Sequence, residues 1–355
     1  MGKIKETRKL YKDTINQVTK SEENWIAFLD SASWNFKYKF TDQILIFAQR
    51  PDATACAEME NEWNKKCHRW VNKDANGIFV LSKDENSPYP FRLVFDVSDT
   101  HNAKGTEYKL WSVKPEYEQE IIETLDSTFG AETEENSLAK CIVVNAYNMV
   151  ADNIQDYMTS IQQYKKGTLL ENVADDEMFN ILVPTVWASV SYMMMKRCGI
   201  DAQKEINIQE FSFIKNFDSD KIITILGTAT SEIAEMGLRE IAKTVINLQN
   251  EERNQNRTFV KNQKQEYSNN KEIDRGGIEN ERENRVHESG RLQHTKSSDG
   301  ERENTKWQIR KNEVALSNES QTRRIFDIID GQKTEQRIDR SPRESNRDDK
   351  TNNRK

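Results

Sequence analysis

The order of hydrophobic and polar positions predicts two helices near the start of the chain. From Ser21 onward apolar residues recur at helical spacing, and Ser21 followed by two glutamates is typical of a helix N-terminus. A second helix is expected from Thr41, with a run of apolar residues in its middle and Pro51 at its end. The segment between these helices, 34–40, mixes aromatic and basic side chains.

Short runs of β-branched and aromatic residues predict a small antiparallel sheet after the second helix. The runs are 69–71, 78–81 and 91–95. Asn76-Gly77 stands between the first two runs and favours a tight hairpin turn, because both residues tolerate left-handed backbone angles. The sequence therefore predicts an α+β domain over residues 1–115.

The pattern from 116 to 250 is mainly helical. Apolar positions three and four apart form a stripe over residues 233–248, and Ser231 with Glu232 would begin that helix. The longest apolar run, 181–195, contains Pro184 and is shorter than the roughly 20 residues that span a bilayer. We therefore expect a buried helix there, in a second, helical domain, and no membrane insertion.

Composition predicts that the rest of the chain does not fold. Of 355 residues, 35% are hydrophobic and 31% charged, and the mean hydropathy is −0.89. Apolar residues are scarcest in 251–355, which has too little apolar surface to offset the entropy of ordering. This segment is expected to be a disordered tail, and its one apolar cluster, 325–329, is a candidate docking helix.

Charge is distributed unevenly along the chain. Lys and Arg number 17 against 16 Asp and Glu in residues 1–110, 11 against 22 in 111–250, and 24 against 21 in 251–355. The middle region is thus strongly acidic, which favours a basic protein partner and would repel DNA. The four cysteines are far apart and the start is charged, so we expect a reduced, cytoplasmic protein.

Motifs of several enzyme classes are missing from the sequence. It contains no HExxH, no phosphate-binding glycine loop and no GxSxG, and the neighbours Cys67 and His68 would point in different directions. The interpretation is a protein that is not an enzyme and holds neither cofactor nor metal.

Aromatic and basic residues between 34 and 73 favour binding of single-stranded nucleic acid. Aromatic faces stack on unpaired bases, and Lys and Arg neutralise phosphates. Rings from this stretch would stack, glutamine amides would add hydrogen bonds, and the cations would line the path of the backbone. The candidate DNA-binding residues are Tyr38, Lys39, Gln43, Gln49, Arg50, Lys65, Lys66, Arg69 and Lys73.

A structural interpretation of the same residues stays open. The tryptophans of a domain this size are often core residues, and scattered lysines often only solvate a face. Tyr38 and Phe40 would then close the core, Gln43 would act as a cap, and Arg50 would pair with Asp52.

An ordered series of short segments resembles the N-terminal domain of ArdC-type antirestriction proteins, and more closely the LtrC-like proteins of Firmicutes plasmids and conjugative elements. The series comprises WIAFL (25–29), YKFTDQILI (38–46), QRPDATA (49–55), WNK (63–65), RWV (69–71), GI (77–78) and VFDVSDT (94–100). Two later segments are similar to the helical region of the LtrC-like proteins: SYMMMKRCGID (191–201) and LGTATSEIAEM (226–236).

The resemblance implies single-stranded DNA binding by the first domain, in a protein of a mobile genetic element linked to conjugation or antirestriction. ArdC-type proteins also carry a zinc-dependent peptidase domain, whereas this chain has no HExxH. Its turn at 73–77 is less basic and less glycine-rich than the family pattern. Two alternatives remain: a protein-interaction module acting through 116–250, or a truncated remnant of a longer helicase- or methylase-type protein.

Overall fold

The computed structural model of the chain describes residues 2–84, 87–133 and 137–273, which belong to one unit. A helix continues through residues 251–273, so the predicted disordered tail does not begin at 251. The remainder of that predicted tail, with the apolar cluster 325–329, lies outside the described residues.

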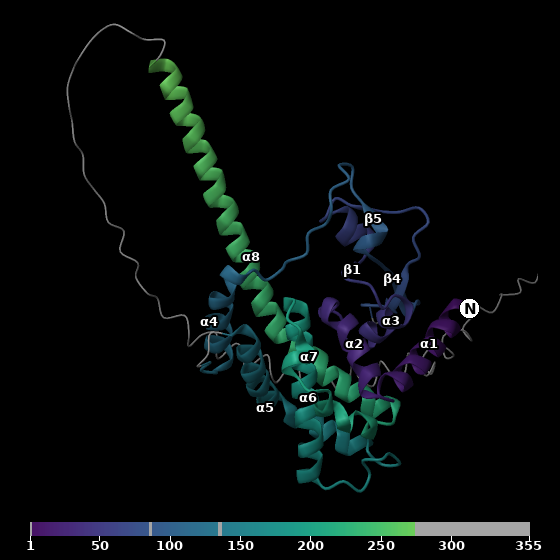
Figure 1. Ribbon diagram of the computed structural model, residues 1–355. Helices are drawn as coiled ribbons and strands as arrows, with labels where there is room; N and C mark the ends of the chain where they lie inside the picture. The colour runs from purple at the N-terminus through teal and green to yellow at the C-terminus, as the bar shows by residue number, and fades with distance from the viewer. Residues whose placement is uncertain (1, 85–86, 134–136, 274–355) are drawn as a thin grey trace, which may run out of the picture. The chain divides into compact units, whose positions relative to one another are not determined.

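Three helices open the chain, coloured purple in Figure 1: α1 (Gly2–Val18), α2 (Glu22–Trp34) and α3 (Phe40–Gln49). The Ser21 hydroxyl caps α2 by accepting a hydrogen bond from the backbone N–H of Asn24 (3.2 Å). The predicted cap and the stop before Pro51 are therefore confirmed.

The strands form two small antiparallel sheets. One has the order β1 (Cys56–Ala57), β4 (Phe91–Asp96), β3 (Ile78–Leu81), and packs against α3. The other is a two-stranded ribbon of β2 (Trp70–Val71) and β5 (Thr100–His101), with Trp70 opposite His101. The predicted α+β class, a helix-plus-sheet part followed by helices, is confirmed.

The predicted hairpin at Asn76-Gly77 is wrong. β3 pairs with β4 and β2 pairs with β5, so the two runs that flank Gly77 are not partners. Gly77 does not adopt a positive φ. It is small for a different reason, because a Cβ there would meet Leu93 Cδ2 at 2.9 Å and the ring of Phe95 at 3.1 Å.

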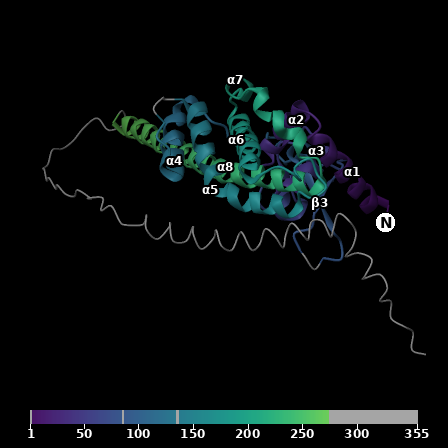
Figure 2. The ribbon, with the colours of Figure 1, turned by 90° about the horizontal axis from the view of Figure 1, so that it is seen from below.

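The rest of the described chain is mainly helical (teal and green in Figure 1). The helical elements are the 3₁₀ turn η3 (Pro115–Tyr117), α4 (Glu118–Phe129), α5 (Leu138–Tyr164), α6 (Asp175–Cys198), α7 (Ala202–Glu205), the 3₁₀ segment η4 (Ile208–Asn216) and α8 (Asp220–Ile273). α8 packs against α4, α5 and α6, and Figure 2 shows it running past these helices.

The apolar stripe predicted on the last helix is buried, but the predicted helix start is wrong. Ile233, Ile241 and Val245 are all buried. α8 already begins at Asp220, so Ser231 lies within the helix and not at its N-terminus. α6 contains the predicted buried run 181–195; it is the one described helix long and apolar enough to cross a membrane, and most of it is inside the protein.

The N-terminal helices and the acidic helices share one core. The indole Nε1 of Trp25 donates to the Ser189 hydroxyl (2.8 Å), and both side chains are buried. On α8, Gly227 lies directly against the ring of Phe40 from α3. The predicted boundary near 115 therefore separates two segments whose side chains interlock.

Gly227→Ala is expected to destabilise the protein, because the added Cβ would overlap the buried Phe40 ring. Overpacking of this kind costs about 1–3 kcal/mol. Gly237→Ala is the matched control on the same helix, since its Cβ would meet mainly the flexible end of Met194. Urea unfolding of both variants measures the difference; equal stability of the two would contradict the close packing of α3 on α8.

Candidate nucleic-acid interface

The rings at 36–40 face inward. Phe36 and Phe40 are buried. Tyr38 packs against the buried cluster around Ile46, and its hydroxyl donates to the Cys56 carbonyl (2.8 Å). Burial raises the pKa of Tyr38 well above its ordinary value. Phe40 closes the core against Phe28, as the structural interpretation expects, whereas Tyr38 is partly buried and packs on the cluster under the sheet. The stacking role of Tyr38 stays a prediction.

Both glutamines of the predicted site bind protein groups. Gln43 is 1% exposed; its Nε2 donates to the Asn35 carbonyl (3.3 Å) and its Oε1 accepts from Ser231 (2.7 Å). Gln49 exchanges two hydrogen bonds with the backbone of Phe79, at 2.9 and 3.0 Å, and so holds β3 against α3. Both amides are therefore already engaged by protein groups.

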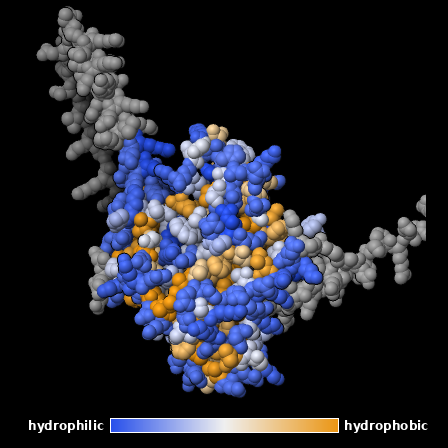
Figure 3. Space-filling model, turned by 45° about the vertical axis from the view of Figure 1, so that its right-hand side comes forward, coloured by the Kyte–Doolittle hydropathy of each residue, from blue (hydrophilic) through white to orange (hydrophobic). Residues whose placement is uncertain are grey.

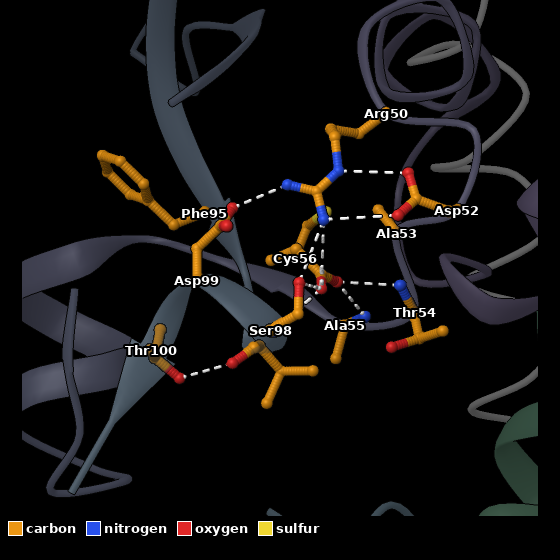
Figure 4. A network of polar contacts seen from close by, with 12 residues as sticks. Arg50, Asp52, Ala53, Thr54, Ala55, Cys56, Phe95, Ser98, Asp99 and Thr100 are labelled. Carbon is orange, nitrogen blue, oxygen red and sulfur yellow. Dashed lines mark hydrogen bonds and ion pairs between the residues drawn. The ribbon is translucent and has the colours of Figure 1, made fainter. Parts of the chain in front are cut away.

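Arg50 is part of a partly exposed ion network (Figure 4). Its guanidinium donates to Asp99 (2.9 Å), Asp52 (3.1 Å) and the Ser98 hydroxyl (3.0 Å). The hydrogen bond to Asp52 raises the pKa of Arg50, and the same bond lowers the pKa of Asp52. The expected pairing of Arg50 with Asp52 is confirmed, and these carboxylates already balance the charge that was predicted to face phosphates.

Asp96 joins the loop after α3 to the end of β4. Its Oδ1 accepts from the backbone N–H groups of Thr54 (2.8 Å) and Ala55 (2.9 Å), and its Oδ2 accepts from Ser98. The Arg50 guanidinium lies at 4.0 Å from the same carboxylate. The network thus fixes the segment 96–99, which leads into β5 of the ribbon.

Arg69 is buried under the ribbon. Its side chain is 6% exposed and donates to the Thr100 hydroxyl (2.7 Å), the Thr100 carbonyl (2.8 Å) and the Thr106 carbonyl (3.0 Å). These bonds position β5 and the loop that follows it. Arg69 is therefore a positioning residue. Its burial argues against the predicted direct contact with DNA.

The lysines of the predicted site are exposed: Lys39, Lys65, Lys66 and Lys73. Lys65 donates to Asn61 (3.1 Å), and Lys66 forms an i,i+4 ion pair with Glu62 (2.8 Å). Exposed pairs of this kind contribute little stability and exchange readily with other anions. The DNA-binding role of these lysines stays a prediction.

Trp70 is an exposed ring of this region, as is Tyr108, which packs edge to face on Trp63. The Trp70 side chain is 46% exposed, and its ring lies 6.4 Å from that of His101 on the paired strand. The nine residues of segment 65–73 include four Lys or Arg and no Asp or Glu. We define the Trp70 surface as Lys65, Lys66, His68, Trp70, Lys73 and His101, all of which are exposed.

An unusual backbone path presents this surface. Residues Met59–Asn64 form a π-helix, anchored by the Trp63 indole, which donates to the Phe95 carbonyl (2.9 Å). His68 then adopts φ 52°, a left-handed conformation that costs a non-glycine residue about 1–3 kcal/mol in strained settings and that clusters at functional sites. The reversal at His68 leads directly into β2 and Trp70.

Sequence reasoning included Trp70 among the available rings but did not place it in the site, and it missed His101. Trp70 lies in a two-residue strand, and its partner His101 is 31 positions away, so its exposure depends on pairing that local pattern does not specify. Among the described residues, no group of three His, Cys, Asp or Glu side chains is placed to hold a metal ion. Comparison of the chain with protein-family models, curated proteins and solved structures finds no match.

Asp42 on α3 provides a test of how the sheet is attached. Its carboxylate accepts from the Leu81 N–H (2.8 Å), and burial raises its pKa to about 6. Because the folded-state pKa is above the unfolded value near 4, the group's contribution to stability is present at low pH and is lost as pH rises from about 4 to about 6. Asp42→Asn keeps the acceptor, so we expect it to raise the free energy of unfolding at pH 8, by on the order of 1–3 kcal/mol, and to change it little at pH 4.

Asp126→Asn is the control with the opposite sign. Although burial raises the pKa of Asp126, hydrogen bonds from Asn145 and Thr133 lower it overall, so its stabilisation is present at neutral pH and is lost on acidification. Urea unfolding at pH 4 and pH 8 is the measurement. Loss of stability in Asp42→Asn at pH 8 would contradict the account of the buried carboxyl.

Proposed function

We propose that this protein binds single-stranded DNA through the Trp70 surface. The observation that supports it is the exposed Trp70 ring, opposite His101, within a nine-residue segment that carries the exposed Lys65, Lys66 and Lys73 and no carboxylate. An exposed tryptophan beside several cations provides both terms of single-strand binding, base stacking and phosphate neutralisation.

An unpaired strand suits this surface better than a duplex. The bases of a duplex are already stacked on each other, so an exposed indole face gains little from them. The ribbon is only two residues long in each strand and is too small to fill a major groove. A single strand can instead place one base on Trp70 while its phosphates lie along Lys65 and Lys66.

The charge distribution favours the same end of the chain. The acidic region 111–250 has twice as many carboxylates as cations, which disfavours a nucleic acid path over α4–α8. Arg50 and Arg69 would contribute indirectly, by holding the ribbon in shape.

The resemblance to ArdC-type and LtrC-like proteins supplies a biological setting. In that setting the chain would act in the cytoplasm as a DNA-binding protein of a mobile genetic element, on the single strand that conjugation transfers. The sequence has no HExxH, so any role in antirestriction would rest on DNA binding and not on peptide hydrolysis.

Trp70→Ala is expected to weaken binding of a fluorescent oligo-dT roughly tenfold, because stacking on one aromatic ring contributes about 1–3 kcal/mol. Trp70→Phe should retain most of the affinity. The matched control is Tyr147→Ala, an exposed ring on α5 in the acidic region. Fluorescence anisotropy of the full-length chain is the measurement, and equal affinities for Trp70→Ala and wild type would refute the proposed stacking.

Replacing Lys65, Lys66 and Lys73 together by Ala is expected to flatten the salt dependence of oligonucleotide binding. For a single strand each neutralised phosphate contributes about 0.7 to the slope of log affinity against log salt, so three lysines account for about two. The control is Lys204→Ala with Lys243→Ala, two exposed cations elsewhere in the chain. A slope that stays at the wild-type value would exclude these lysines from the interface.

A further inference from the structure

A groove lies on the other part of the molecule, between α2, α6 and the segment 203–211. It has a volume of about 800 Å³. Its floor is apolar and aromatic: Ile26 and Phe211 are buried, and the rings of Tyr192 and Phe211 meet edge to face at 6.2 Å. Cavities of this size hold a drug-sized molecule or a few side chains of a peptide.

Ile208 lines this groove and is 45% exposed. Apolar side chains reach the surface in several patches (Figure 3). Ile208 differs in the conformation of the backbone that carries it. Ile208 begins η4, a 3₁₀ segment of nine residues, whereas 3₁₀ runs longer than three or four residues are uncommon because their hydrogen bonds have poorer geometry. Phe213, in the same segment, is 40% exposed.

The rim of the groove carries excess negative charge. Asp30 accepts from the Tyr192 hydroxyl (3.0 Å) and pairs with Lys196 (2.8 Å), so its charge is balanced. Lys204 pairs with Asp201 (3.2 Å). Glu23 and Glu205, which are both exposed and line the groove, form no ion pair with a described residue.

We propose that this groove docks a basic, amphipathic segment of a partner protein. An apolar side chain of the partner would cover Ile208 and fill the groove over Phe211, while Lys or Arg would pair with Glu23 and Glu205. Charge complementarity selects this occupant: a nucleic acid would be repelled by the two carboxylates, and a second copy of this acidic groove would bring like charges together. The site is separate from the Trp70 surface, so it does not depend on DNA binding.

The test uses the full-length chain and a fluorescent peptide of Leu and Lys placed at helical spacing. Two companion peptides, with Glu in place of Lys or Ser in place of Leu, remove one half of the proposed chemistry each. Saturable binding is expected for the Leu/Lys peptide, with both companions at least tenfold weaker.

Substitutions then locate the site. Ile208→Ser is expected to weaken the Leu/Lys peptide roughly five- to tenfold, since about half an isoleucine side chain would otherwise be buried. Glu23→Gln with Glu205→Gln should weaken it further and reduce its salt dependence. The controls are Phe179→Ser, an equally exposed apolar residue on α6, and Glu120→Gln with Glu177→Gln, two exposed carboxylates outside the groove.

Loss of affinity in the groove variants with wild-type affinity in the controls would support the proposal. Absence of saturable binding would overturn it, as would equal losses in the groove variants and the controls. Binding of the Leu/Glu peptide as strong as that of the Leu/Lys peptide would also overturn it.

Discussion

The close approach of α3 to α8 is the packing constraint on which the rest of the structure depends. Gly227 leaves room for the Phe40 ring, and one turn further along each helix the Ser231 hydroxyl donates to buried Gln43. Trp25 adds a second interlock by donating to Ser189 on α6. Because bulky rings fill these contacts, α2 and α3 share a core with the acidic helices α6 and α8.

This commitment determines which surfaces are left for recognition. The aromatic stretch before α3 is used as core, and the polar residues at the end of α3 are used to attach the sheet. Arg50 connects its loop to Asp99, and Arg69 holds β5 through Thr100. Arg69 is buried and Arg50 is partly exposed, and both guanidinium groups are already bonded to protein groups that fix their geometry. The small ribbon stays accessible, with Trp70 exposed and the exposed Lys65, Lys66 and Lys73 near it in the sequence.

The sequence was sufficient for features that depend on neighbours along the chain. The Ser21 cap, helices α2 and α3, the strands β2, β3 and β4 and the buried face of α8 were predictable from spacing and capping chemistry, whereas α1 was not predicted. Strand pairing was not predictable, because the partner of β2 is β5 and the intervening β3 and β4 pair with each other. The start of α8 was misplaced for a related reason: Ser231 resembles a cap locally, whereas its hydroxyl bonds a residue 188 positions away. The distant partners of Gln43, Arg50 and Arg69, which are Ser231, Asp99 and Thr100, were not predictable for the same reason, since only the fold brings them close.

The central claim is that an unpaired DNA strand contacts the β2–β5 ribbon and not the aromatic stretch before α3. Photo-crosslinking of an oligonucleotide that contains 5-iodouracil, followed by mass spectrometry of the crosslinked peptides, measures this directly. The account predicts crosslinks to Trp70 or His101. Crosslinks confined to residues 34–50, or to the acidic helices, would contradict it.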